Sequence, residues 1–268
     1  TRAKEGSRVR AARSPDVDAA RFERVGHRFA DGRWGVREVS FGLPRGALTV
    51  VAGPNGAGKS VLMKHLAGLL EPTEGRVLVG DEDALDGRGR PFGAAKVGYV
   101  FQSAEAQVLG DTALDDASLG PANLGFPWPE VERRARDALA RCGLSGREDD
   151  LAWSFSGGEA RRLAIASVLA MEPSILVLDE PFANLDRAGV TQVVALVRDL
   201  LAEGTTVVLL THELEKVLAL AARLVVLVEG SVVFDGSPSE GLAAGLRRWG
   251  LADPLAAPRR LEDLAWLD

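Results

Sequence analysis

The chain has 268 residues, 46% of them hydrophobic and 26% charged, as in an ordinary globular protein with one large domain or one domain and a small appendage. Its 32 basic and 38 acidic residues give a net charge of −6, which argues against a broad nucleic-acid-binding surface. The single cysteine, Cys142, excludes both an intramolecular disulfide and a zinc site built from several cysteines.

We do not expect a membrane-spanning segment. No apolar run in the sequence approaches the roughly 18–20 residues that cross a bilayer, and the first residues show no signal-peptide pattern. We therefore expect an intracellular protein that acts at a membrane only through partners.

The N-terminal region predicts a polar tail followed by two strands. Residues 1–16 are basic and polar without periodicity, which is typical of disorder. Strands are expected at 21–29 and 36–43, joined by a turn at Asp31-Gly32. Phe29 ends the first strand. Its ring could stack on an adenine base or serve as an ordinary strand aromatic, and the local sequence favours neither.

A phosphate-binding pattern follows. Residues 48–52 predict an apolar strand, and a helical pattern with Leu62 and Leu66 begins after Ser60. The segment between them fits G-x-x-x-x-G-K-[ST] and reads Gly53, Pro54, Asn55, Gly56, Ala57, Gly58, Lys59, Ser60. In this strand–loop–helix context the backbone amides can wrap a polyphosphate, Lys59 can reach its terminal phosphates, and the Ser60 hydroxyl can bind Mg²⁺. We call residues 53–60 the phosphate loop.

The middle of the chain predicts a helical insertion between two strands. Short strands are expected at 76–79 and 97–101, and residues 112–153 are mainly helical in pattern. Gln102 directly follows the second strand. Its amide could contact Mg²⁺ or an attacking water, or it could be a solvated loop residue.

A serine-glycine-glycine-glutamate segment precedes the next helix. Ser156 is a good N-cap, and Glu159 stands three residues later as in a capping box. This is compatible with a plain capped helix. The Gly157-Gly158 pair favours more, because it lets backbone amides at a helix N-terminus approach a phosphate closely. We call residues 156–159 the signature segment.

Two carboxylates end a buried strand. Residues 175–178 are continuously apolar, as in a parallel strand covered on both faces, and Asp179-Glu180 follow directly. Paired with the phosphate loop, Asp179 is predicted to coordinate Mg²⁺ and Glu180 to orient the water.

The remaining elements complete an α/β pattern. Asp186 precedes a helix at 187–201, and a buried-type strand at 205–210 ends at Thr211-His212. Ligands bind at such strand ends in open α/β sheets. Strands at 224–228 and 232–234 predict a closing hairpin, and a short helix and a proline-interrupted helical tail follow.

The order of these motifs resembles that of ATP-binding-cassette (ABC) ATPases from about residue 21 to 235. That resemblance implies an α/β P-loop NTPase fold. It has a RecA-like mixed sheet core with an N-terminal antiparallel β subdomain, a helical signature subdomain at about 103–170 and a short C-terminal helical extension. The implied domains are a tail at 1–16, the ATPase domain at 17–236 and the extension at 237–268.

A narrower likeness is to ATPases of energy-coupling-factor (ECF) transporters, which take up vitamins, cobalt or nickel. It rests on residues 155–166 and 168–173, on Leu119-Gly120-Pro121-Ala122-Asn123-Leu124-Gly125, and on Gln107 as a second glutamine. Ser103-Ala104 replace the usual Asn-Pro, and Phe182 and Asn184 depart from the usual Pro-Thr-Ala-Gly-Leu-Asp. These departures leave the transporter subgroup and the cargo open.

The resemblance also implies roles and partners. Two ATPase subunits, identical or paralogous, would pair head to tail, each signature segment (Ser156, Gly157, Gly158, Glu159) facing the partner's phosphate loop and ATP-Mg²⁺. Phe29 would stack on adenine, Glu180 would be the general base, His212 would hold the γ-phosphate, and Asp186 would communicate across the interface. A transmembrane coupling subunit would bind the groove formed by about residues 102–123 at the cytoplasmic face of the membrane. A substrate-binding membrane subunit would complete the complex, with no nucleic acid involved.

Two other classes remain open from the sequence. An ATPase of another importer subfamily, for amino acids or sugars, is the nearer one. A soluble cassette protein outside transport, such as a cluster-assembly protein, is the other.

Overall fold

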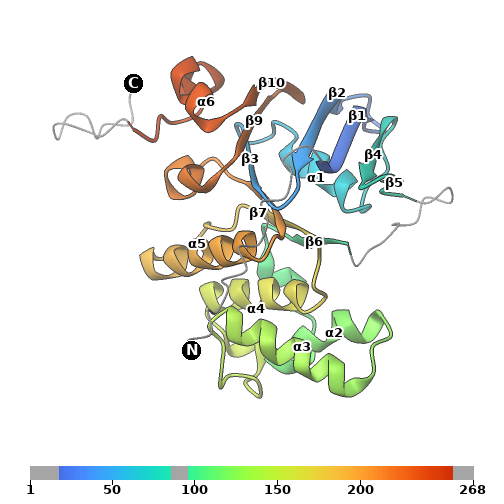
Figure 1. The fold of residues 1–268 in the computed structure, drawn as a ribbon, viewed down its shortest axis with the longest axis vertical. Helices are drawn as coiled ribbons and strands as arrows, with labels where there is room; N and C mark the ends of the chain where they lie inside the picture. The colour runs from blue at the N-terminus through green and yellow to red at the C-terminus, as the bar shows by residue number, and fades with distance from the viewer. Residues whose placement is uncertain (1–17, 86–95, 256–268) are drawn as a thin grey trace, which may run out of the picture.

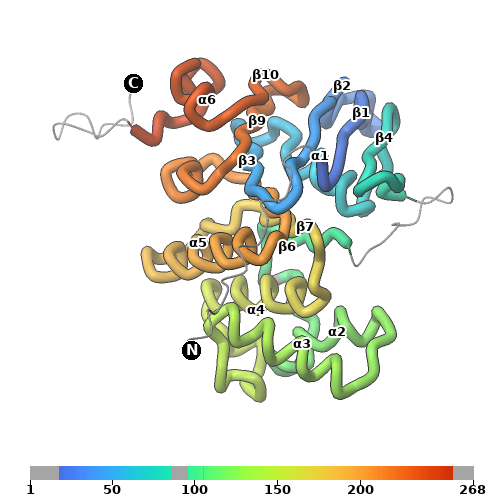
Figure 2. The backbone as a smooth tube through the Cα atoms, in the orientation of Figure 1, coloured from blue at the N-terminus to red at the C-terminus, as the bar shows by residue number. Residues whose placement is uncertain are grey.

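The computed structural model describes residues 18–85 and 96–255. The predicted tail at 1–16 lies outside them. Two sheets and a helical layer make up the fold (Figures 1 and 2). The N-terminal sheet is antiparallel, with strand order β2-β1-β4-β5. Its strands are β1 (Asp18–Arg28), β2 (Trp34–Pro44), β4 (Glu74–Val79) and β5 (Glu82–Asp83).

The second sheet has six strands in the order β10-β9-β3-β8-β7-β6. Its strands are β3 (Leu48–Ala52), β6 (Val97–Val100), β7 (Ile175–Asp179), β8 (Thr206–Leu210), β9 (Arg223–Val228) and β10 (Ser231–Gly236). Neighbours are parallel except for the β9–β10 hairpin. Because β3, β6, β7 and β8 are parallel, the segments that follow them emerge at one edge of the sheet.

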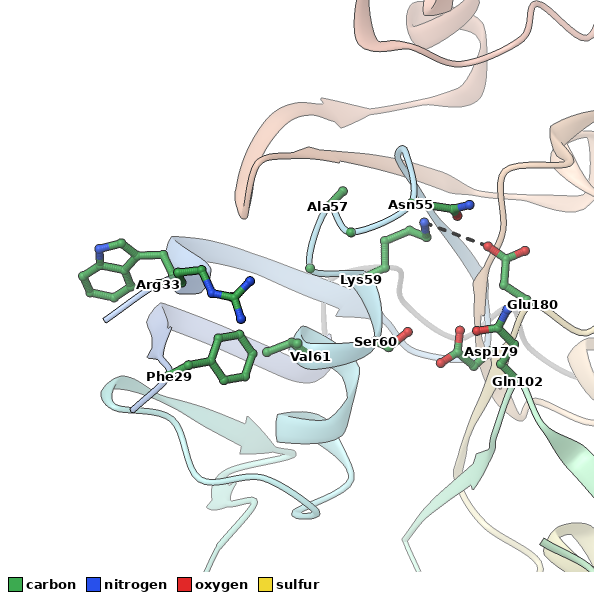
Figure 3. A pocket seen from close by; sticks show the side chains of 14 residues that line it. Phe29, Arg33, Asn55, Ala57, Lys59, Ser60, Val61, Gln102, Asp179 and Glu180 are labelled. Atoms are coloured by element: carbon green, nitrogen blue, oxygen red, sulfur yellow. Dashed lines mark ion pairs between the residues drawn. The ribbon is translucent and has the colours of Figure 1, made fainter. Parts of the chain in front are cut away.

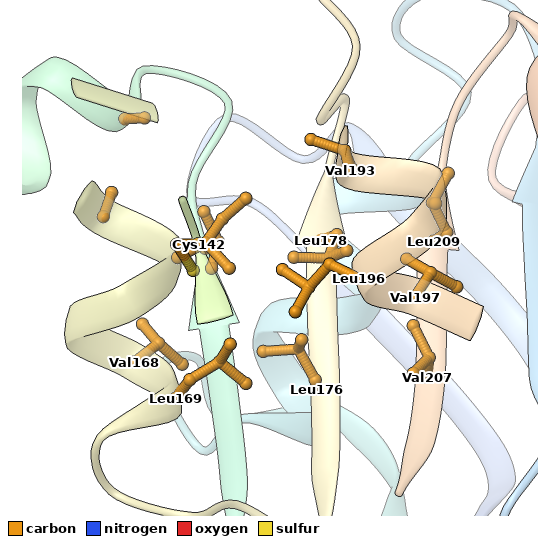
Figure 4. Packing of buried hydrophobic residues seen from close by; sticks show 14 of the residues in the cluster. Cys142, Val168, Leu169, Leu176, Leu178, Val193, Leu196, Val197, Val207 and Leu209 are labelled. Atoms are coloured by element: carbon orange, nitrogen blue, oxygen red, sulfur yellow. The ribbon is translucent and has the colours of Figure 1, made fainter. Parts of the chain in front are cut away.

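The parallel strands are apolar on both faces because each face supports its own core. Alternate residues of β7 point in opposite directions: Leu176 and Leu178 belong to one buried cluster, and Val177 belongs to the other. Figure 4 shows Leu176 and Leu178 between α4 and α5 side chains such as Val168 and Leu196. The opposite cluster joins the sheet to α1 and to the antiparallel sheet.

Six α-helices are described, and α2, α3 and α4 form one layer at the end of the molecule away from the antiparallel sheet (Figure 1). The helices are α1 (Lys59–Leu66), α2 (Ala113–Asn123), α3 (Trp128–Arg141), α4 (Gly157–Leu169), α5 (Arg187–Ala202) and α6 (Pro238–Ala244). The 3₁₀ turns are η1 (Ala104–Gln107), η2 (Ala152–Ser154), η3 (Leu214–Lys216), η4 (Leu218–Leu220) and η5 (Leu246–Trp249). In the described ranges, no helix is both long and apolar enough to cross a membrane.

The predicted α/β fold is confirmed, with small local differences. The strand expected at 97–101 ends at Val100, and the two-residue strand β5 was not expected. The expected C-terminal helical tail consists of α6 and η5 in the described residues, and Pro254 lies in a non-helical stretch. Pro258 lies outside the described residues. Cys142 is the C-cap residue of α3 and is buried.

Candidate active site

The phosphate loop joins β3 to α1 and needs glycine at two of its turns. Gly53 and Gly58 have φ values of 152° and 98°, which side chains rarely adopt. A Cβ atom at Gly53 would lie 2.2 Å from the Leu227 carbonyl oxygen, and one at Gly58 would lie 2.3 Å from the Gly35 carbonyl oxygen. The loop is therefore wedged between the β9 end and the start of β2. This close approach fixes the curvature of a backbone that can surround a polyphosphate.

Lys59 lies inside this curve. Its Nζ donates to the carbonyl oxygens of Gly53 at 2.8 Å and Pro54 at 3.2 Å, and lies 3.9 Å from the Glu180 Oε1 (Figure 3). Burial lowers the pKa of Lys59, and the nearby carboxylates of Glu180 and Asp179 oppose that shift. The ammonium group is thus held at the centre of the loop, where it can also face a terminal phosphate.

The end of β7 places both predicted carboxylates at the same cavity. Asp179 and Glu180 are 5% and 6% exposed, which is rare for acidic residues without a cationic or metal partner. The Tyr99 hydroxyl on β6 donates to Asp179 Oδ2 at 2.8 Å. Burial and the neighbouring Asp179 charge raise the pKa of Tyr99, so its hydroxyl stays protonated at neutral pH and keeps this orientation.

Glu180 has an unusual backbone. Its φ is 48°, in the left-handed region that a glutamate rarely occupies. Such conformations cluster at functional sites because the surrounding structure must hold them. The His212 Nδ1 lies 3.2 Å from both Glu180 carboxylate oxygens, so the end of β8 meets the end of β7 at this residue.

A cavity of about 490 Å³ runs from the two carboxylates to an aromatic ring, and the predicted site residues Gly53, Pro54 and His212 are not part of its lining. The predicted residues among its lining are Phe29, Asn55, Gly56, Ala57, Gly58, Lys59, Ser60, Gln102, Asp179 and Glu180. Phe29 lies at the far end with Arg33 beside it (Figure 3). Its ring packs so closely on Gly35 that a Cβ there would lie 2.9 Å from Phe29 Cε2. The partly exposed ring offers an apolar surface at the end of the cavity away from the carboxylates.

The donor set suits a hard cation. The Ser60 hydroxyl, the Gln102 amide and the Asp179 carboxylate line the same cavity. Within the described ranges no group of three or more His, Cys, Asp or Glu residues could hold a metal alone. Mg²⁺ does not require such a group, because it is usually bound through one or two carboxylates, phosphate oxygens and waters.

Comparison with known proteins gives the family. The family model described as ABC transporter matches residues 36–183. This chain belongs to that family. It is an ATPase of the ATP-binding-cassette type, and it binds ATP.

The relatives and solved structures agree with this assignment. Energy-coupling factor transporter ATP-binding protein EcfA2 of Symbiobacterium thermophilum is 41% identical over 258 residues, covering 91% of this chain and 88% of the relative. EcfA of Methanocaldococcus jannaschii is 38% identical over 214 residues, covering 80% and 77%. The structure of cbiO1 from Clostridium perfringens, part of the ABC transporter complex cbiONQ, has a TM-score of 0.76 at 31% identity, covering 85% of this chain and 92% of that one. A dimeric cassette bound to ADP and Pi has a TM-score of 0.74 at 26% identity, covering 82% and 98%.

The signature segment starts α4 and stays outside the ATP cavity. Of the described residues that line that cavity, none comes from α4. Ser156 and Glu159 form the predicted capping box, in which each side chain accepts from the other residue's backbone N–H. The Ser156 backbone and hydroxyl donors and the Arg147 guanidinium lower the pKa of Glu159 to about 2. The Gly157 and Gly158 amides therefore lie at the partly exposed start of a well-capped helix whose remaining turns are mostly buried.

Asp186 is also placed away from the cavity. It caps α5, where its carboxylate accepts from the Gly189 N–H at 2.7 Å. Asn184, which stands where related ATPases usually carry glycine, has a φ of 60°. Asparagine is one of the few other residues that tolerate this conformation, so the departure from the family pattern keeps the turn.

Sequence reasoning missed three residues that hold the site. Tyr99 orients Asp179, and its only signal was a lone hydroxyl in an apolar strand. Gln107, noted only as a second glutamine, accepts from the Phe101 N–H and donates to the Tyr99 carbonyl, so it completes the open edge of β6. Arg161 on α4 had no signal as a site residue, because its partners are distant in sequence.

Proposed function

We propose that this chain is the ATP-hydrolysing subunit of an ECF-type importer of a vitamin or a metal ion, bound peripherally at the cytoplasmic face of the membrane. The identity to two proteins named as ECF ATPases supports the subfamily. One observation carries the mechanism: the phosphate loop and both carboxylates share a cavity, whereas the signature segment lies outside it, at the partly exposed N-terminus of α4. The site is therefore half of a composite site.

Within one subunit, each part of the cavity takes one part of ATP. Phe29 stacks on adenine, residues 53–60 wrap the phosphates, and Lys59 faces the γ-phosphate. Ser60, Gln102 and Asp179 would hold Mg²⁺, which would supply charge neutralisation at the phosphate oxygens. Glu180 orients the attacking water and accepts its proton, and His212, beside Glu180, contacts the γ-phosphate.

A second ATPase subunit supplies the missing half. In a head-to-tail pair, Ser156, Gly157, Gly158 and Glu159 of one subunit face the phosphates held by the other, with Asp186 near the interface. Exposed backbone amides at a helix N-terminus suit that role, because they attract anions. Hydrolysis removes the γ-phosphate that bridges the two halves, so the pair opens and closes with the state of the nucleotide.

A groove beside the cavity suits the membrane subunit. Its walls come from α1, the end of β6 and η1, and include Lys64, Phe101, Ser103, Gln107 and Leu109. The Leu109 side chain is 80% exposed, and an exposed leucine at the rim of a groove suits an apolar helix as partner. Ser60, Gln102 and Asp179 line both the groove and the ATP cavity, so a docked coupling helix would lie directly beside the nucleotide site.

The catalytic assignment is tested with Glu180→Gln. We expect the variant to bind ATP with Mg²⁺ at about wild-type affinity, to lose turnover by more than about 100-fold and to accumulate as a dimer with ATP. Size-exclusion chromatography with light scattering detects the dimer, and phosphate release measures turnover. A Glu180→Gln protein with undiminished turnover contradicts the role of Glu180.

The transport assignment is tested by isolating the complex. The tagged protein is purified in mild detergent from membranes of its host. A small membrane coupling subunit together with a substrate-binding membrane protein supports the ECF proposal and identifies the cargo. Recovery of the membrane subunits of another importer type, or only of soluble partners, refutes it.

A further inference from the structure

Arg161 is the residue that connects the signature helix to the catalytic strand ends. It lies one turn into α4 and is 7% exposed. Its Nη1 donates to the Glu180 carbonyl oxygen at 2.6 Å, and its Nη2 donates to the Gln102 carbonyl oxygen at 3.0 Å. One planar guanidinium group thus bridges the segments that follow two neighbouring parallel strands, β6 and β7.

A bridge of this kind suits arginine better than any other side chain. Burying a cation costs free energy unless several acceptors receive its N–H groups. The guanidinium donates from two nitrogens that are fixed in one plane, whereas a lysine would have to reach both carbonyl oxygens from a single nitrogen on a flexible stem. The Gln102 and Glu180 carbonyl oxygens are therefore both bound by one rigid group on α4.

The Arg161 hydrogen bond helps to hold the unusual backbone conformation of Glu180. Glu180 has a φ of 48°, and its N–H donates to the Leu210 carbonyl at 2.9 Å. Its carbonyl accepts from Arg161 and, at 3.2 Å, from the Ala183 N–H. Without Arg161, one of the contacts that hold this left-handed conformation is lost. The carboxylate on the same residue would then shift relative to the cavity.

We infer that Arg161 is a positioning residue. It fixes the positions of Glu180 and Gln102 relative to each other and to α4. This inference rests on the proposed role of Glu180 in hydrolysis. The same helix begins with the signature segment, so a movement of α4 on closing with a second subunit is transmitted through Arg161 to the chain's own Glu180. The position of Glu180 in one subunit thereby depends on whether the signature segment of that subunit is bound to the ATP site of the second subunit.

The test compares Arg161→Lys with Arg134→Lys. Arg134 is a matched control because its side chain is only 13% exposed and its partners, Glu130 and Glu172, lie in the helical layer away from the ATP cavity. We expect Arg161→Lys to lower kcat by about 10- to 100-fold, since small misplacements of a catalytic group have effects of this size. KM and the affinity for a fluorescent ATP analogue should stay within about three-fold. Arg134→Lys should keep kcat within about two-fold.

A double variant separates positioning from general loss of structure. If Arg161 acts through Glu180, then Arg161→Lys in the Glu180→Gln background causes little further loss of turnover. Equal losses in both backgrounds overturn the inference, as does a folded Arg161→Lys protein with wild-type kcat. Thermal unfolding is measured for every variant. Arg161→Gln, a neutral donor, replaces the lysine variant if that one unfolds.

The single variants also distinguish the two proposals. If Glu180→Gln keeps its turnover, the proposed function of Glu180 fails and the inference fails with it. If Glu180→Gln is inactive while Arg161→Lys turns over normally, only the inference is wrong.

Discussion

Asp116 is the buried residue of the helical layer whose substitution should lower the free energy of unfolding most. It lies in the first turn of α2, is 3% exposed, and accepts three hydrogen bonds. Two come from the backbone N–H groups of Leu109 at 2.6 Å and Gly110 at 2.9 Å, and the third comes from the Ser167 hydroxyl on α4. The carboxylate therefore holds the loop that carries the proposed groove residue Leu109 against the signature helix.

We predict that Asp116→Ala lowers the free energy of unfolding by roughly 2–4 kcal/mol. A hydrogen bond to a charged group contributes about 1.5–3 kcal/mol. The summed free energy of the three hydrogen bonds is an upper limit. The loop at Leu109 is exposed, so water can replace part of its hydrogen bonding to Asp116 in the variant. Asp115→Ala is the control: it is exposed, it belongs to the capping box of the same helix, and it removes the same charge from the first turn. Its loss should be about 0.5–1 kcal/mol.

The assay is urea unfolding of both variants and the wild type, followed by tryptophan fluorescence. Equal slopes with different midpoints show that the change is one of stability. If Asp116→Ala and Asp115→Ala differ by less than about 1 kcal/mol, the three hydrogen bonds do not contribute as reasoned. The same result would also contradict the idea that Asp116 holds the loop at the groove against α4.

Two further predictions concern the phosphate loop and the signature segment. Lys59→Ala should weaken binding of a fluorescent ATP analogue by more than about 10-fold. The control is Lys64→Ala, which is also on α1 but outside the ATP cavity and should bind the analogue with wild-type affinity. Equal affinities of the two variants would contradict the assignment of Lys59. Glu159 should make stability depend on pH, because its pKa falls from 4.5 to about 2 on folding. This contribution is present above about pH 4.5 and is lost as the pH falls through about 2, so wild type and Glu159→Gln should converge in unfolding midpoint between those values. A difference that does not change with pH would refute it.

The parts of the site that are contiguous in the chain could be predicted from the amino-acid sequence. The phosphate loop, the strand ending in Asp179-Glu180 and the capping box at Ser156 are local patterns, because each depends on backbone conformation over a few residues. The fold class followed for the same reason: continuous apolar strands alternating with helical patterns require a parallel sheet covered on both faces.

The side chains that support that site became apparent only from the folded chain. Tyr99 contacts Asp179 across 80 positions, and Arg161 contacts Gln102 across 59. No local pattern marks such contacts, because they exist only once β6, β7 and α4 are packed against one another. The sequence also could not show that the signature segment lies outside the cavity its own chain forms. That separation is set by the packing of α4 on the sheet, and it is what makes a second subunit necessary in the proposed mechanism.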